Sequence, residues 1–545
     1  MADTVQQALR ELLENDTAAV VHDTGTWTWR EHLQEASAQA SALLSLMERD
    51  RPVHVGALLG NTPAFLHAIA GAGLAGFPLV GINNTRRGEG LARDIVRADC
   101  QILLTDAEHA PLLDGLDLGG VTVFDVASPE WRALVDGAGP LEPYREVGPT
   151  DPFMLIFTSG TSGDPKPVLL AHMMVLFSGG TLVPRFSITS DDVVYLSMPL
   201  FHSNAILAGW CVSLCSGAAM APATFSASHF VDDVRRYGAT YMNYVGKPLA
   251  YILATVEQPD DADNPLRVAF GNEATDRDIE EFGRRFGCTV WDGFGSTEAA
   301  VIITRDEGTP PGSIGRGLPG VDVYDPETVT PCAHAEFDDD GALINADEAV
   351  GQLVNTQGAG FFTGYYNDEA ATNECLRNGM FWSGDLAYKD ADGWIYLAGR
   401  TADWMRVDGE NLAAAPIERI LQRLPQLSRV AVYGVPDEHV GDQIMSAMVL
   451  RDETSLTPVE FEKFLAQQAD LSPKAWPRYV RIAADLPTTA TNKILKRALE
   501  TEGPTAGDGV LWVRKNERYV AVSTGRDTAG EERETVSGAE GFAFR

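Results

Sequence analysis

A loop rich in threonine, serine and glycine follows an apolar run in the first third of the chain. Residues 153–157 are typical of a buried strand, and residues 158–168 read Thr-Ser-Gly-Thr-Ser-Gly-Asp-Pro-Lys-Pro-Val. Glycines let backbone N–H groups turn toward one point, while the hydroxyls and Lys166 add donors and a positive charge. A Walker A loop needs Gly-Lys-Ser/Thr and an opening helix, whereas Pro165 and Pro167 flank this lysine. The residues predict a phosphate-binding loop of another kind, with a surface turn as the alternative.

Two further segments combine a predicted strand end with glycines and polar groups that could contact a ligand. Residues 266–270 predict a strand that ends in Gly-Asn-Glu at 271–273, and residues 291–298 read Trp-Asp-Gly-Phe-Gly-Ser-Thr-Glu. An aromatic face can stack on a base, Thr297 can donate to a phosphate, and Glu298 can hold Mg²⁺ as a hard oxygen ligand. Taken alone, the second segment is equally compatible with a strand-end turn capped by a glutamate.

Three isolated polar residues complete the set of candidates. His202 follows an apolar run that ends at Met198, a place where a lone histidine is usually structural. Asp385 lies on an expected turn, where a carboxylate can accept from two hydroxyls of a ribose. Lys493 lies in the segment Pro-Thr-Thr-Ala-Thr-Asn-Lys-Ile-Leu-Lys, and a cation there could relieve repulsion between two anions. A solvated lysine at a helix start is the alternative for Lys493.

These motifs, in this order, resemble the acyl-adenylate-forming enzymes: acyl-CoA synthetases, peptide-synthetase adenylation domains and luciferases. Their phosphate loop reads approximately Thr-Ser-Gly-Ser/Thr-Thr-Gly-x-Pro-Lys-Gly, from which this chain departs at Ser162 and Pro167. Residues 399–411 narrow the resemblance to very-long-chain acyl-CoA synthetases and fatty acid transport proteins. Ala402 stands where that family has a hinge residue, usually Asp or Lys, and Asp408 replaces a basic residue.

The resemblance implies a role for each candidate residue. The catalytic residues would be Lys493, His202 and Thr297, with His202 bordering the carboxylate pocket. Mg²⁺ would be held by Glu298 and Thr161. The remaining contacts to ATP and CoA would come from Thr158, Ser159, Gly160, Thr161, Ser162, Gly163, Lys166, Gly271, Asn272, Glu273, Asp292, Phe294, Gly295, Asp385, Arg400 and Gly409.

Composition limits the classes of partner. The chain has 545 residues, more than one hydrophobic core usually serves, and 77 acidic against 42 basic residues give a net charge of −35. That charge argues against nucleic acid as a partner. The six cysteines are scattered, no secretory signal or membrane-spanning run is visible, and a cytoplasmic location is expected. Peripheral membrane contact and the oligomeric state stay open.

Short apolar strands alternate with helical segments along the chain, which predicts an α/β protein with largely parallel sheets. The string Gly-Ala-Gly-Leu-Ala-Gly at 71–76 matches a dinucleotide fingerprint, but it ends a helix instead of opening one. We therefore expect layered β/α subdomains over residues 1–401. A small, mobile α+β domain is expected over residues 402–522, and a disordered tail over 523–545.

The predicted function is that of an AMP-forming acyl-CoA synthetase, whose substrates are ATP, a carboxylic acid and CoA and whose metal is Mg²⁺. Apolar stretches at 205–210 and 241–251 suit a long or bulky acid, either a fatty acid or a sterol side-chain acid. The alternatives are an acyl-AMP ligase that loads a carrier protein, a nucleotide-binding pseudoenzyme and, last, a Rossmann oxidoreductase.

Overall fold

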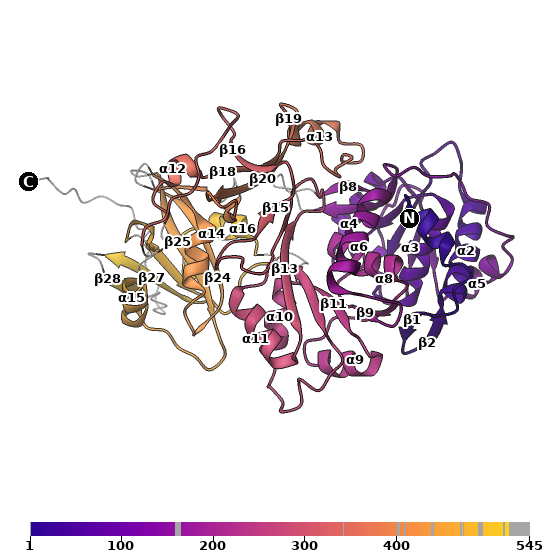
Figure 1. Cartoon of the computed structure of the whole chain (residues 1–545), viewed down its shortest axis with the longest axis horizontal. Helices are drawn as coiled ribbons and strands as arrows, with labels where there is room; N and C mark the ends of the chain where they lie inside the picture. The colour runs from indigo at the N-terminus through magenta and orange to yellow at the C-terminus, as the bar shows by residue number, and fades with distance from the viewer. Residues whose placement is uncertain are drawn as a thin grey trace, which may run out of the picture. The chain divides into compact units, whose positions relative to one another are not determined.

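The structure is a computed structural model, and its elements are shown in Figure 1. It describes residues 2–158, 165–339, 341, 343–400, 404–407, 410–437, 441–468, 471, 473–488, 494–515 and 518–522. These residues form two compact units, one through Arg400 and one from Trp404 onward. The predicted boundary at residues 401–402 and the predicted disordered tail from residue 523 lie outside the described residues and stay predictions.

One sheet of the first unit has the strand order β6-β5-β3-β4-β7-β8. Its strands are β3 (His54–Leu58), β4 (Leu79–Gly81), β5 (Cys100–Thr105), β6 (Thr122–Asp125), β7 (Pro152–Thr158) and β8 (Lys166–Ala171). All pairs are parallel except β7 with β8, which form an antiparallel pair on either side of the predicted phosphate loop. Strands β3 and β5 are buried along their whole length, as expected for parallel strands covered on both faces.

A second sheet has the order β15-β14-β13-β12-β11-β9-β10-β1-β2. Its strands are β1 (Ala18–His22), β2 (Gly25–Thr28), β9 (Val193–Leu196), β10 (Ala219–Pro222), β11 (Tyr241–Val245), β12 (Val268–Asn272), β13 (Thr289–Gly295), β14 (Ile302–Thr304) and β15 (Arg316–Gly317). Strands β9, β11, β12 and β13 are parallel neighbours, so their carboxyl ends lie at one edge. The nucleotide segments predicted from the sequence end there.

Helices connect and cover these two sheets. They are α1 (Val5–Glu11), α2 (Trp29–Leu46), α3 (Pro63–Ala75), α4 (Gly88–Arg97), η1 (Ala110–Leu113), α5 (Pro129–Asp136), α6 (His172–Phe186), α7 (Ser203–Ala205), the π-helix η2 (Ile206–Trp210), α8 (Cys211–Ser216), α9 (Phe230–Tyr237), α10 (Gly246–Leu253) and α11 (Asp276–Phe286). Helix α2 begins with a capping box in which Thr28 and Glu31 satisfy each other's backbone N–H groups. In Figure 1, α2, α3 and α5 lie together near the N-terminus.

The glycine string at 71–76 serves helix packing. It lies in buried helix α3 and at its end, where Gly76 adopts φ 79° as the left-handed cap. A Cβ on Gly71 would lie 2.7 Å from the carbonyl oxygen of Ala36 in α2, and one on Gly73 would meet Leu9 of α1 at 2.7 Å. The glycines therefore let three helices approach closely, which agrees with the prediction that no dinucleotide loop opens here.

A third sheet of the first unit is antiparallel and has the order β17-β16-β18-β20-β19, with β21 paired to β20. Its elements are β16 (Val321–Asp325), β17 (Thr330–Pro331), α12 (Ala346–Ala349), β18 (Gly351–Asn355), α13 (Glu369–Cys375), β19 (Leu376–Arg377), β20 (Met380–Lys389) and β21 (Ile395–Arg400). The turn between β20 and β21 contains Gly393 at φ 84°, as the Asp-Gly pair predicts.

The second unit has a hydrophobic core of its own. Its sheet has the order β23-β22-β25-β26-β27-β28, with β24 paired to β25. The elements are β22 (Trp404–Val407), β23 (Glu410–Ala413), α14 (Ala414–Leu421), β24 (Leu427–Asp437), β25 (Gly441–Leu450), α15 (Pro458–Ala466), η4 (Pro473–Ala475), β26 (Tyr479–Ile482), α16 (Lys496–Glu502), β27 (Val510–Lys515) and β28 (Arg518–Val522). Ile417, Val432, Phe461 and Trp512 are buried among its core residues. The expected α+β character is confirmed.

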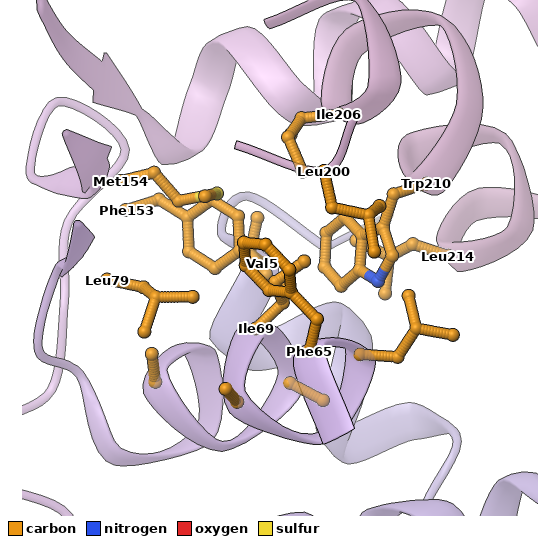
Figure 2. Close-up of a cluster of buried hydrophobic side chains, with 14 of the residues drawn as sticks. Val5, Phe65, Ile69, Leu79, Phe153, Met154, Leu200, Ile206, Trp210 and Leu214 are labelled. Atoms are coloured by element: carbon orange, nitrogen blue, oxygen red, sulfur yellow. The ribbon is translucent and has the colours of Figure 1, made fainter. Parts of the chain in front are cut away.

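An apolar cluster in the first unit joins the elements that carry the candidate residues. Figure 2 shows side chains of α3, β7 and η2 in this cluster. The rings of Phe153 in β7 and Trp210 in η2 stack with centroids 5.4 Å apart, and both residues are fully buried. The strand that leads to the phosphate loop is thereby packed against the segment that follows His202. Among the described residues, no helix is both long and apolar enough to cross a membrane, and all six cysteines are free.

Candidate active site

The carboxyl ends of β12 and β13 bring two predicted nucleotide segments side by side. Gly271 pairs with Tyr244 of β11 on one side and with Asp292 of β13 on the other. A Cβ on Gly271 would lie 2.1 Å from the carbonyl oxygen of Tyr244, so only glycine fits at this position. Gly295 ends β13 and is exposed, and among the described residues other than its chain neighbours no atom lies within 4 Å of the place a Cβ would occupy. Phe294, which precedes it, is half-buried.

Asp292 is a buried acid behind these strand ends. Its Oδ2 atom accepts from the Tyr244 hydroxyl and from the backbone N–H of Ala274, each at 3.0 Å. Burial raises the pKa of this carboxyl to about 7, against the opposing effect of the Ala274 hydrogen bond. Glu273, between the two segments, has a left-handed backbone with φ 67°, a conformation that side chains other than glycine rarely adopt.

The raised pKa of Asp292 predicts a pH effect on stability. Between about pH 4 and pH 7 the folded protein holds a proton on Asp292 that the unfolded chain has lost, so this group lowers stability as pH rises through that window. An Asp292→Asn variant can keep both hydrogen bonds, because both donors reach one oxygen. We expect the melting temperature to fall less between pH 4.5 and pH 7.5 in this variant than in the wild type. Differential scanning fluorimetry measures both melting temperatures. An equal fall in the variant and the wild type would contradict the assignment.

Thr297 and Glu298 are each held by a side chain from a distant segment. The Thr297 and Ser203 hydroxyl oxygens are 2.8 Å apart, and the Tyr365 hydroxyl donates to Oε1 of Glu298 at 2.8 Å. Ala299, the next residue, has φ 44°. Strained backbone of this kind persists only where surrounding contacts hold it, and it often marks functional sites.

Lys166 lies beside Tyr365. It begins β8, opposite Thr158 at the end of β7, so the loop between them is closed by an antiparallel pair. The Lys166 Nζ atom is 5.3 Å from the centroid of the Tyr365 ring and 3.9 Å from Oε2 of Glu374, which is largely exposed. Tyr365 therefore connects the phosphate-loop lysine with Glu298. Arg97 supports the same loop end by donating to the Pro165 carbonyl at 3.0 Å.

His202 is the residue before helix α7. Its backbone is extended, its N–H bonds the Pro199 carbonyl, and its ring lies 4.4 Å from that of Phe201. The next two residues are tied to the nucleotide segments: Ser203 to Thr297, and Asn204 to Asn272, whose Oδ1 accepts from Asn204 Nδ2 at 3.1 Å. The segment expected to border the carboxylate and the residues expected to contact the nucleotide therefore meet at one edge of the sheet.

Asp385 lies within strand β20, so the expectation that it lies on a turn was wrong. It is the backbone partner of Arg400 in β21. Asp385 is buried, and its N–H bonds the Ser383 hydroxyl at 3.0 Å. The other predicted site residues, namely Ser159, Gly160, Thr161, Ser162, Gly163, Gly409 and Lys493, lie outside the described residues. Their roles stay predictions.

Two residues of this site, Tyr365 and Asn204, were not predicted from the sequence. Tyr365 reaches Glu298 only because residues 364–366 pair with β8, through the Tyr366 N–H to the Pro167 carbonyl and the Leu169 N–H to the Gly364 carbonyl. Asn204 was visible beside His202, but its partners lie 39 to 68 positions away. No local pattern signals either contact.

Comparison with known proteins identifies the family. The AMP-binding enzyme family model matches residues 10–366, and the model of the AMP-binding enzyme C-terminal domain matches residues 416–493. Over 513 residues the chain is 50% identical to the medium/long-chain-fatty-acid–CoA ligase FadD17 of Mycobacterium marinum, covering 94% of this chain and 98% of the relative. It is 43% identical over 517 residues to the steroid-22-oyl-CoA synthetase of Rhodococcus jostii, covering 94% and 93%.

A solved structure shares the fold. ATP-bound MatB from Rhodopseudomonas palustris matches with a TM-score of 0.80 at 22% identity, covering 92% of this chain and 99% of that one. The predicted fold class is thus confirmed, and so is the predicted family. The chain belongs to the AMP-binding enzyme family.

Proposed function

We propose that the chain is an AMP-forming acyl-CoA ligase that activates medium- or long-chain fatty acids through an acyl-adenylate. The relatives named above support the reaction and the substrate class. The contact between Ser203 and Thr297 carries the proposal structurally. It joins the segment that would border the carboxylate to the residue that would donate to the α-phosphate.

In the first half-reaction, a carboxylate oxygen of the acid attacks the α-phosphorus of ATP, and the bond to the pyrophosphate oxygen breaks. Thr297 donates a hydrogen bond to an α-phosphate oxygen, and Lys166 offsets negative charge on the phosphates. Lys493 bridges the carboxylate and the α-phosphate, which relieves repulsion between two anions. His202 borders the carboxylate.

The nucleotide is held by the strand ends and the phosphate loop. Phe294 stacks on the adenine, and Asp385 and Arg400 contact the ribose. The remaining nucleotide contacts come from Thr158, Ser159, Gly160, Thr161, Ser162, Gly163, Gly271, Asn272, Glu273, Asp292 and Gly295. The open space beside Gly295 and the tight fit at Gly271 are compatible with a flat base lying against this edge.

Glu298 and Thr161 would hold Mg²⁺. Among the described residues, no group of three or more His, Cys, Asp or Glu side chains could bind a metal. Mg²⁺ is usually held by one or two carboxylates together with the substrate phosphates and waters, so Glu298 with the ATP phosphates would be enough. Bound there, the ion would neutralise charge on the phosphates. Tyr365 fixes the orientation of Glu298 by donating to one of its two oxygens.

In the second half-reaction, the CoA thiol attacks the acyl carbon and AMP leaves, which forms the thioester. The second unit would rotate between the two steps, withdrawing Lys493 and bringing Gly409 and its neighbours toward the CoA path. Such a rearrangement also keeps water from the activated acyl group. A cytoplasmic location belongs to the same proposal.

ATP–pyrophosphate exchange across a panel of acids tests the substrate class. We expect the kcat/KM of exchange with dodecanoate to exceed that with hexanoate by on the order of 10²-fold or more, because each buried CH₂ contributes about 0.8 kcal/mol. Thioester formation with free CoA should follow. Higher kcat/KM with a steroid side-chain acid than with any fatty acid would overturn the substrate class. Exchange without thioester would indicate transfer to a carrier protein. A complete lack of exchange with every acid of the panel would indicate a binding protein.

A further inference from the structure

The residues after His202 are tied to the core of the sheet by a chain of amide groups. The Asn204 amide nitrogen donates to the Tyr244 carbonyl at 3.0 Å and to Oδ1 of Asn272 at 3.1 Å. Its own Oδ1 accepts from the amide nitrogen of Asn243 at 2.8 Å. Both amide protons and the oxygen of Asn204 are thus used, and the three bonds reach the second half of β11 and the last residue of β12.

The inner end of this chain of amides is fixed by packing. Asn243 is fully buried in β11, and its Oδ1 lies 2.8 Å from the place a Cβ on Gly209 of η2 would occupy. Tyr241, two residues earlier on the same face of β11, donates its hydroxyl to the Ala208 carbonyl at 2.7 Å. The π-helix that follows α7 is therefore anchored on β11 at two points, which is a reason for its irregular turn to persist.

The outer end of the chain of amides reaches the nucleotide side. Asn272 is the last residue of β12 and follows Gly271, the position at which only glycine fits. Ser203, the neighbour of Asn204, makes a second link through its hydroxyl contact with Thr297. Two consecutive residues of α7 thus contact two different nucleotide segments, while His202 precedes them on the acid side. Displacement of any one of these elements must disturb the others, because their hydrogen-bonding groups are shared.

We propose that Asn204, assisted by Ser203, is a positioning residue that couples the binding of the carboxylic acid to the binding of ATP. Neither residue needs to contact the reacting atoms. The acid orders the segment at 202–204, and this segment holds Asn272 and Thr297 in the geometry that the nucleotide requires. By linkage, ATP strengthens acid binding by the same factor. The inference rests on the proposed function, since it assumes that acid and ATP are the two ligands.

The coupling factor can be measured as the KM for dodecanoate at limiting ATP divided by that at saturating ATP, in the pyrophosphate exchange assay. We expect a factor of about ten in the wild type, within the usual range of coupling between sites. In Asn204→Ala we expect a factor near one. Thermal shifts with AMP, with dodecanoate and with both together give a second readout: the excess of the joint shift over the sum should vanish in this variant.

Asn264 provides a matched control within the same unit. Its amide nitrogen donates to the Asp261 and Phe286 carbonyls at 2.6 and 3.0 Å, and its oxygen accepts from the Leu266 N–H at 2.8 Å. Asn264→Ala therefore removes three hydrogen bonds, as Asn204→Ala does, at a place away from the candidate site. We expect it to lower the melting temperature but to keep the wild-type coupling factor.

Several outcomes would overturn the inference. They are a wild-type factor of one, an unchanged factor in Asn204→Ala, or an equal loss in Asn264→Ala. If Asn204→Ala does not fold, Ser203→Ala removes the link to Thr297 and must lower the factor. Failure of the proposed function looks different, because the wild type would then show no exchange with dodecanoate, and this inference would fall with it.

Discussion

Replacing Lys493 with alanine is expected to lower the rate of ATP–pyrophosphate exchange by at least about 10²–10³-fold, the usual loss when one preorganised charge-stabilising group is removed. The physical reason is that the acid and the α-phosphate are both anions, and their approach needs a cation between them. The loss should appear in kcat more than in the KM for ATP, since the bridging contact forms only as the two anions meet. Exchange assays at saturating acid and ATP measure it.

A second lysine, later in the sequence, provides the control. Lys515 is exposed at the end of β27, so Lys515→Ala removes the same charge without a predicted role. It should retain wild-type exchange. If Lys493→Ala also retains exchange within about two-fold, far from the 10²-fold loss expected for such a group, Lys493 is not the bridging cation.

Lys493→Ala also separates the two half-reactions. The second step begins from an acyl-adenylate already formed, and Lys493 is withdrawn from it in the proposed mechanism. Thioester formation from chemically prepared dodecanoyl-AMP and CoA should therefore be reduced far less than exchange. Equal loss in both assays would mean that the substitution disturbs the site as a whole.

Much of this fold was predictable because strand and helix signals agree with one another along the chain. The apolar run before Thr158 predicts β7, the two prolines around Lys166 predict that no helix opens there, and the Asp-Gly pair at 392–393 predicts the turn before β21. These are local features, and local sequence decides them. The site residues Thr297 and Glu298 were predicted by resemblance, and the structure places Thr297 beside Ser203 and Glu298 beside Tyr365.

The contacts that hold the site together could not be predicted in the same way. Tyr365 reaches Glu298 across 67 positions, and its approach depends on the pairing of residues 364–366 with β8. Asn204 bonds Asn272 across 68 positions, through strands that become neighbours only in the folded sheet. A sequence pattern carries no record of such partners, because each residue alone is an ordinary polar or aromatic residue. The structure reveals these partners, because the pairing of strands and segments brings distant residues together.

Removing the Glu298 carboxylate is the second substitution with a large expected effect. In Glu298→Ala we expect a loss of at least about 10²-fold in exchange at physiological Mg²⁺, because the ligand that would hold the ion beside the phosphates is gone. Raising Mg²⁺ should restore part of the rate if the defect is in metal affinity. A readout besides activity is the binding of Mn²⁺ in the presence of ATP, followed by electron paramagnetic resonance, which should weaken in parallel.

Tyr365→Phe tests how Glu298 is held. The buried Tyr365 hydroxyl donates to Glu298, and burial, followed by the negative charge of that carboxylate, raises the pKa of the tyrosine, so it remains a donor at physiological pH. Loss of a hydrogen bond that orients a metal ligand typically costs about 10–100-fold in metal affinity or activity. The matched control is Tyr366→Phe, since the hydroxyl of Tyr366 donates to the Asp99 carboxylate at 2.8 Å, outside the candidate site. If the two tyrosine variants require the same Mg²⁺ concentration for half-maximal exchange, Tyr365 does not act through the metal ligand. A higher requirement in Tyr365→Phe alone, smaller than that of Glu298→Ala, would place this hydroxyl behind Glu298 as the group that orients it.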